Sequence, residues 1–192
     1  LGKQSDISFY GTSHEANAAF AASYYAKHTG KVGVCVATSG PGTANLINGL
    51  ADAYFDKTAV LAITGQVETK KIGTTAKQYI NQQVSMGAVT KSSELVASIE
   101  SVIPATAKAL ATAINEATIT HLSIPVDLFS KEVSVDKVPS LALQSPVYQN
   151  NRHTDSLGIL AKALEDAQRP LILLGKACLT QKEAVFRLAE RI

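Results

Sequence analysis

Glu15 is the residue whose type and position first suggest chemistry. It stands at the predicted start of a helix, in the segment Ser13-His14-Glu15-Ala16. Carboxylates are favoured near helix N-termini because they complement the helix dipole. Glu15 therefore has a structural interpretation, as a charge at a helix start, beside a catalytic one.

A glycine-rich turn follows, in Thr38-Ser39-Gly40-Pro41-Gly42-Thr43-Ala44-Asn45, between a predicted strand and a predicted helix. Glycines let the backbone approach a ligand, and a helix N-terminus attracts anions. The turn is not the dinucleotide fingerprint, because Asn45 stands where a third glycine is needed, and no Gly-Lys-Ser/Thr of a Walker loop follows. A tight turn without a ligand is the alternative interpretation.

Two glutamines are further candidates for a binding site. Gln66 ends a predicted strand, where α/β folds tend to place ligands, and Gln78 lies in the long polar stretch after it. A capped strand end and a solvated loop are the alternative. His28, His121 and His153 form no triad or metal-ligand spacing, so no metal site is predicted.

The apolar pattern alternates between strand and helix. This rhythm predicts an α/β fold with a parallel sheet flanked by helices. Gly30 supplies a stop for the first helix, and Pro125 places the last strand of the series at an edge or near a strand end. The predicted strands are 7–10, 32–37, 60–65 and 121–127, and the predicted helices are 14–28, 44–55 and 98–117.

The sequence predicts one domain and the beginning of another. Residues 1–130 form the first domain, and residues 131–153, which are rich in Pro, Gln and Asn, form a linker. Residues 154–192 are expected to begin a second, incomplete α/β domain, with a helix at 156–167, a strand at 170–175 and a helix at 181–192.

Composition excludes several classes of function. Charged residues make up 18% of the chain and the formal net charge is +2, which argues against nucleic acid or a membrane surface as partners. The chain does not begin like a secretory signal. Cys35 and Cys178 lie in apolar runs and are interpreted as reduced core residues of a cytoplasmic protein, with a disulfide as the weaker alternative.

Taken together, the motifs resemble the pyrimidine-binding domain of thiamine-diphosphate-dependent 2-oxo-acid enzymes, in the acetolactate synthase, pyruvate oxidase and glyoxylate carboligase group. The resemblance covers nearly the whole chain. The segment 170–175 resembles the opening of that family's central domain, and the family's first strand and helix are expected to be missing before Ile7. The matching segments are His14-Glu15, 25–35, 38–46, 49–54, 63–66, 72–74 and 123–128.

The resemblance implies roles for individual residues. The glutamate that matches Glu15 hydrogen-bonds N1′ of the aminopyrimidine, and a carboxyl group in a dry pocket has a raised pKa with which to share that proton. Gln66 and Gln78 match glutamines that line the substrate pocket. The residues matching the cofactor-binding turn are Ser39, Gly40, Pro41, Gly42 and Asn45.

The implied activity is decarboxylation of a 2-oxo acid such as pyruvate, followed by transfer to an acceptor in a carboligation or an oxidation. In the family, Mg²⁺ and the diphosphate bind to a C-terminal domain that this sequence lacks, some members bind FAD, and the site needs two subunits of a homodimer or homotetramer. The chain is therefore expected to hold half a site and to be inactive alone. Lys77 departs from the family pattern, which has an aromatic residue there, and puts acetolactate synthesis in doubt.

Two other classes of function stay open at this point. One is a nucleotide-binding module in which the glycine-rich turn holds a phosphate. The other is a non-catalytic dimerisation domain on the same scaffold, although the carboxylate of Glu15 argues against it.

Overall fold

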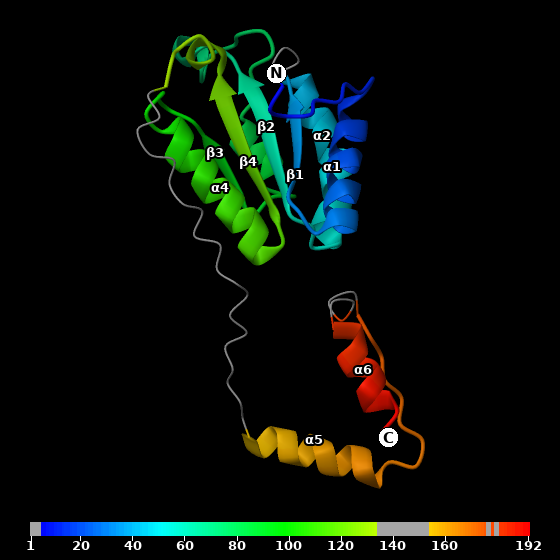
Figure 1. Ribbon diagram of the computed structural model, residues 1–192. Helices are drawn as coiled ribbons and strands as arrows, with labels where there is room; N and C mark the ends of the chain where they lie inside the picture. Colours follow the sequence, from blue (N-terminus) through cyan, green and yellow to red (C-terminus); the bar gives the residue numbers. More distant parts are fainter. Residues whose placement is uncertain (1–4, 134–153, 176–177, 179–180) are drawn as a thin grey trace. The chain divides into compact units, whose positions relative to one another are not determined.

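The computed structural model describes residues 5–133, 154–175, 178 and 181–192, and it divides the chain into two compact units, residues 1–146 and 147–192 (Figure 1). Within the described residues, no helix is both long enough and apolar enough to cross a membrane.

A four-stranded parallel sheet is the frame of the first unit. Its strands lie in the order β1-β2-β4-β3. Val60 of β2 pairs with Gly33 of β1 on one side and with Ile119 of β4 on the other. The predicted α/β fold with a parallel sheet is therefore confirmed. The bounds are Gly33–Ala37 for β1, Val60–Gln66 for β2, Ser92–Leu95 for β3 and Ile119–Pro125 for β4.

Helices cover both faces of this sheet. Alternate residues of β2 point to opposite faces. Val60 packs with buried residues of α1 (Glu15–Thr29) and α2 (Pro41–Phe55), whereas Leu61 packs with buried residues of α4 (Val102–Glu116). The short helix α3 (Gln82–Met86) joins the first of these two cores through Met86.

Two glycines let α1 pack closely against its neighbours. A Cβ atom on Gly49 of α2 would lie 2.6 Å from the carbonyl oxygen of Ala16 in α1, and one on Gly33 of β1 would lie 2.1 Å from that of Ala22. Both distances are shorter than any real contact of a Cβ atom. The N-terminal halves of α1 and α2, which carry Glu15 and Asn45, are therefore held side by side by the close contact at Gly49.

A lysine joins the opposite ends of the same two helices. Lys27 Nζ lies 2.6 Å from both Asp52 Oδ2 and Asp56 Oδ2, and Ser23 donates to Asp52 at 2.8 Å. Burial alone would lower the pKa of Lys27, but hydrogen bonds to the two aspartates raise it. The hydrogen bond from Lys27 lowers the pKa of Asp52. The cluster therefore stabilises the α1–α2 pair.

Several predicted elements are confirmed. Helix α1 ends at Gly30, whose left-handed φ of 70° no other residue adopts as readily. Pro125 ends β4, as predicted for a strand end. Cys35 is buried in the core, Cys178 is only half-buried, and both are free thiols. Helices α5 (Thr154–Asp166) and α6 (Lys182–Ala189) of the second unit lie close to their predicted ranges.

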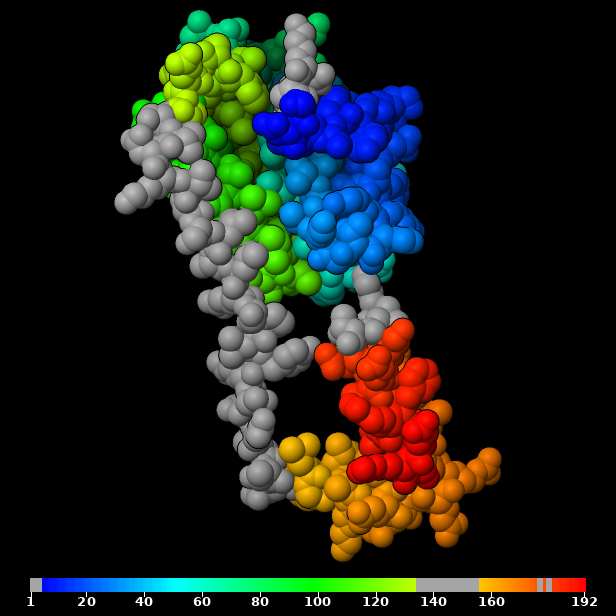
Figure 2. All heavy atoms as spheres, in the orientation of Figure 1, coloured from blue at the N-terminus to red at the C-terminus, as the bar shows by residue number. Residues whose placement is uncertain are grey.

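Other elements differ from the prediction. Residues 7–10 and 170–175 form no strand: among the residues that the structure describes, neither segment pairs with one of the four strands of the sheet. Figure 2 shows the N-terminal residues in dark blue on the surface of the first unit, and Ile7 is 62% exposed. Strand β3 was not predicted, and the stretch after Gln66 contains a 3₁₀ turn (η1, Thr69–Lys71) and α3. Most of the predicted linker, 131–153, lies outside the described residues.

Candidate functional site

The candidate residues gather at the carboxyl edge of the sheet. The turn 38–42 follows β1, Gln66 ends β2, and a 3₁₀ turn, η2 (Val126–Leu128), follows β4. In a parallel sheet these ends lie at one edge, which is where α/β folds bind ligands. A cavity of about 1110 Å³ opens there.

Glu15 and Asn45 meet at the helix starts. Glu15 is the first residue of α1, and the N-cap His14 accepts from the backbone N–H of Ala16 through Nδ1 at 3.1 Å. Asn45, on α2, donates from Nδ2 to Glu15 Oε2 at 3.0 Å. The two residues stand 30 positions apart in the sequence, so packing of α1 on α2 is what makes this contact.

The pKa of Glu15 is lowered in this structure, whereas the resemblance implied a raised pKa in a dry pocket. Its side chain is half-buried rather than enclosed in a dry pocket. The hydrogen bond from Asn45 lowers its pKa, and a backbone N–H at the helix start lowers it further. In this structure Glu15 is therefore an ionised acceptor, and a raised pKa would require further burial.

The glycine turn lies between Glu15 and the loop that follows β2. Gly40 has a left-handed φ of 66°, and a Cβ atom there would lie 2.6 Å from the carbonyl oxygen of Gln78. A Cβ atom on Gly42 would lie 2.7 Å from Thr38 Cγ2 and 3.2 Å from Glu15 Oε1. Larger residues at either position would crowd the carboxylate or move the loop. Pro41 then begins α2, where its missing N–H costs nothing.

The cavity brings together some of the predicted residues and leaves others out. Ser39, Gln66 and Gln78 line it, whereas Glu15 and Asn45 do not. The wall is mainly apolar, with two cations and one carboxylate in it. Its other members are Val36, Ala37, Thr38, Ile63, Gly65, Val67, Glu68, Lys71, Ala76, Lys77, Ile124, Val126 and Phe129.

The two glutamines of the cavity wall, Gln66 and Gln78, differ in burial and in their hydrogen bonds. Gln66 is 3% exposed; its Nε2 donates to the carbonyl of Ile80 at 3.2 Å, and its Oε1 accepts from the N–H of Val67 at 2.9 Å. The amide of Gln66 therefore ties the two ends of the loop together. Gln78 is exposed, and its backbone is left-handed, with φ of 68°.

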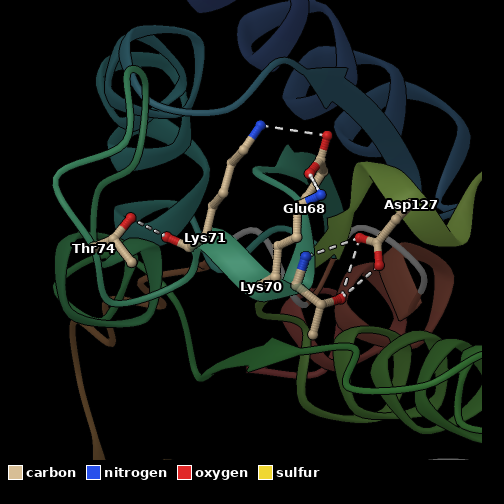
Figure 3. Close-up of polar contacts among 6 residues, drawn as sticks. Glu68, Lys70, Lys71, Thr74 and Asp127 are labelled. Atoms are coloured by element: carbon tan, nitrogen blue, oxygen red, sulfur yellow. Dashed lines mark hydrogen bonds and ion pairs between the residues drawn. The ribbon is translucent and has the colours of Figure 1, made fainter.

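Polar contacts that sequence reasoning missed hold the first part of this loop (Figure 3). Thr69 donates to Asp127 through its N–H at 2.9 Å and through its hydroxyl at 2.9 and 3.1 Å. Lys70 and Lys71 lie 3.0 and 3.3 Å from the carboxylate of Glu68. The N–H of Thr69 lowers the pKa of Asp127, and Lys70, followed by Lys71, lowers that of Glu68. The position of Asp127, two residues after a strand-ending proline, was the available signal.

Comparison with known proteins identifies a family for the N-terminal part of the chain. Residues 1–86 match the family described as thiamine pyrophosphate enzyme, N-terminal TPP binding domain. This part of the chain, residues 1–86, belongs to this family. The match to thiamine pyrophosphate enzymes does not favour the alternatives of a nucleotide-binding module or a purely dimerising domain.

Relatives of the chain agree with the family match. A probable acetolactate synthase large subunit of Methanocaldococcus jannaschii is 37% identical over 97% of this chain and 32% of its own length. A putative thiamine pyrophosphate-containing protein of Bacillus subtilis, YdaP, is 33% identical over 98% of the chain and 33% of its own length. The acetolactate synthase isozyme 2 large subunit of Escherichia coli is 56% identical over 45% of the chain and 16% of its own length. The chain thus spans about a third of the length of the first two relatives.

The residues at the start of α1 and α2 fit the aminopyrimidine half of thiamine pyrophosphate. Glu15 offers an acceptor for a ring nitrogen, and the absence of a side chain at Gly42 keeps its Oε1 from being crowded, since a Cβ atom there would lie 3.2 Å away. The part of the chain that the structure describes contains no group of three or more His, Cys, Asp or Glu that could hold a metal ion. The described residues therefore suit the ring and provide no such cluster for a metal.

Proposed function

We propose that this chain is part of a thiamine-diphosphate-dependent enzyme that decarboxylates a 2-oxo acid such as pyruvate and passes the remainder to an acceptor. The observation that carries the proposal is the Glu15–Asn45 contact beside the Gly40 turn in a chain of this family. When bound, thiamine diphosphate supplies the electron sink that lets the 2-oxo acid lose carbon dioxide.

The residues of this chain have distinct tasks in the proposal. Glu15 holds a proton at a ring nitrogen of the aminopyrimidine, and Asn45 orients its carboxylate. A ring bound against this half-buried carboxylate would exclude water from it and so raise the pKa of Glu15. The remaining cofactor contacts are Ser39, Gly40, Pro41 and Gly42.

The cavity is the proposed place for the substrate and its acceptor, with Gln66 and Gln78 in its wall. Two relatives, a probable acetolactate synthase and an acetolactate synthase, favour carboligation over oxidation. Lys77 gives this wall a cation where the family pattern predicts an aromatic residue. Some members of either type bind FAD, so flavin absorbance alone does not distinguish the two activities. Products formed from pyruvate by the purified full-length protein do, because carboligation makes a new carbon–carbon bond and oxidation does not.

The rest of the proposed enzyme lies outside these residues. Mg²⁺ and the diphosphate bind to a C-terminal domain, and the two half-sites meet in a cytoplasmic homodimer or homotetramer. The 192-residue chain alone then binds thiamine diphosphate weakly and does not turn over.

Glu15→Gln in the full-length protein tests the proposal. Since a positioned acid or base contributes about 10²–10⁴-fold, the variant should lose at least about 100-fold in pyruvate decarboxylation. Glu116→Gln is the matched control, because Glu116 is an exposed glutamate at the C-terminal end of α4, far along the sheet from the turn. Equal rates for Glu15→Gln and the control would remove Glu15 from the mechanism. Failure of the full-length protein to bind thiamine diphosphate with Mg²⁺ in a calorimetric titration would reject the function itself.

A further inference from the structure

A buried chain of hydrogen bonds runs across the sheet from β3 to α3. Ser93 Oγ lies 2.7 Å from His121 Nδ1, and His121 Nε2 lies 2.8 Å from Thr64 Oγ1. Thr64 in turn donates to Gln82 Oε1 at 2.5 Å. His121, Thr64 and Gln82 are each 0% exposed and Ser93 is half-buried, so water cannot replace the two bonds that Thr64 makes. The four residues, Ser93, His121, Thr64 and Gln82, are called the histidine network below.

The direction of each bond in the histidine network is determined. Gln82 Nε2 donates to the carbonyl of Gly65 at 2.9 Å, so Oε1 is the atom that faces Thr64 and it must accept. The single hydroxyl proton of Thr64 is thereby used, and Thr64 Oγ1 must accept from His121 Nε2–H. His121 Nδ1 is left to accept from Ser93. A neutral imidazole protonated at Nε2 satisfies every partner, and burial agrees by lowering the pKa of His121 to about 4.

The histidine network ends where the loop over the cavity ends. Residues 67–81 form this loop, and Gln82 is the first residue of α3 directly after it. The loop supplies Lys77 and Gln78 to the cavity wall, and the backbone of Gln78 lies against Gly40. Its first part is held separately, by Asp127. The second part is held to β2 by the bond from Gln66 to Ile80 and by the bonds that Gln82 makes to Gly65 and Thr64.

We propose that His121 is a positioning residue, which keeps Thr64 as a donor to Gln82 and so holds the loop 67–81 against the Gly40 turn. Without that orientation Gln82 Oε1 has no partner, and the end of the loop loses one of its attachments to β2 while the bonds to Gly65 and from Gln66 remain. The consequence for turnover rests on the proposed function, whereas the position of the loop is a property of the chain itself.

Thr64→Val tests the proposal, because it keeps the shape of the side chain and removes the central hydroxyl. Thr120→Val is the matched control: Thr120 is also 0% exposed, lies next to His121 on β4, and donates to Ala109 of α4 at 3.0 Å. Hydrogen exchange on the 192-residue chain should show amides of 67–81 exchanging about tenfold faster in Thr64→Val than in Thr120→Val, as expected for one or two lost hydrogen bonds. Thr64→Ser, which retains the hydroxyl, should restore slow exchange.

Two results would overturn the proposal, and neither depends on enzyme activity. One is equal exchange of the loop in Thr64→Val and Thr120→Val. The other, which needs no variant, is a ring ¹⁵N spectrum of the wild-type chain showing His121 protonated at Nδ1. In the full-length enzyme, Thr64→Val should raise the KM of the acceptor more than Thr120→Val does. If the loop results hold while no enzyme activity is found, the proposed function fails and the positioning role stands.

Discussion

Gly49→Ala tests the contact that holds Glu15 beside Asn45. The new Cβ atom would lie 2.6 Å from the carbonyl oxygen of Ala16, 2.7 Å from Ala19 Cβ and 2.8 Å from the backbone nitrogen of Phe20. Two of these neighbours are backbone atoms and cannot rotate away. Helices α1 and α2 would have to separate by roughly 0.5–1 Å to reach an ordinary van der Waals distance.

The free energy of unfolding follows from two opposing effects. Overpacking of this kind costs about 1–3 kcal/mol. Alanine is a better helix former than glycine by about 1 kcal/mol, which offsets part of the loss. Because the clash is with backbone, the cost should lie at the upper end, and we expect a net loss of about 1–2 kcal/mol.

Urea unfolding followed by tyrosine fluorescence measures this loss, because Tyr24, Tyr25 and Tyr54 lie on α1 and α2. Gly158→Ala in α5 is the control: nothing lies within 4 Å of its Cβ position, so it should stabilise its own helix by up to about 1 kcal/mol. A Gly49→Ala variant as stable as the wild type would refute the close packing of α1 on α2.

Three further predictions follow from the same structure. Asp52→Asn should cost about 1 kcal/mol of unfolding free energy at neutral pH, measured by urea titration. Lys27 lowers the pKa of Asp52 below 3.8, so the wild type loses this advantage as the pH falls through the lowered pKa. The difference in stability between the variant and the wild type should then vanish. Burial lowers the pKa of His121 from 6.5 to about 4, so stability should be complete above pH 6.5 and fall by about 3 kcal/mol as the pH drops to 4, a slope that His121→Gln should abolish. Gly40→Ala, with its left-handed φ and its contact with Gln78, should speed amide exchange of the loop 67–81 in the chain and weaken thiamine diphosphate binding by the full-length protein; unchanged exchange would contradict the contact.

Local signals predicted most of the elements around the site. Regular spacing of alanines and the stop at Gly30 were enough for α1, and the apolar run before the turn was enough for β1. Strand β3 was missed because Ser92–Leu95 is short and mostly polar, so only its pairing with β4 makes it a strand. The apolar segment 170–175 was wrongly predicted as a strand because composition does not supply the neighbour that a strand needs.

The candidate site, like the fold, could be predicted from the sequence only in part. Glu15 could be identified from its place at a helix start, but its bond to Asn45 and its lowered pKa depend on how α1 packs against α2. His121 was interpreted as an ordinary strand residue, since its partners Thr64 and Ser93 come from two other strands. Contacts between residues far apart in the sequence are what the local pattern could not predict. The assignment of catalytic and binding roles stays a prediction.

The strand order also determines when this sheet can form during synthesis. Strand β4 lies between β2 and β3, yet it is the last of the four to be synthesised. Val60 of β2 therefore cannot pair with Ile119 of β4 until that strand has been made. Until residue 125 has emerged from the ribosome, one edge of β2 is unpaired, and Leu122 of β4 is not yet available to pack with Leu61. Such distant pairings fold slowly and leave a nascent chain open to aggregation. A truncation after residue 86 contains only β1 and β2, so it should not fold as a soluble domain.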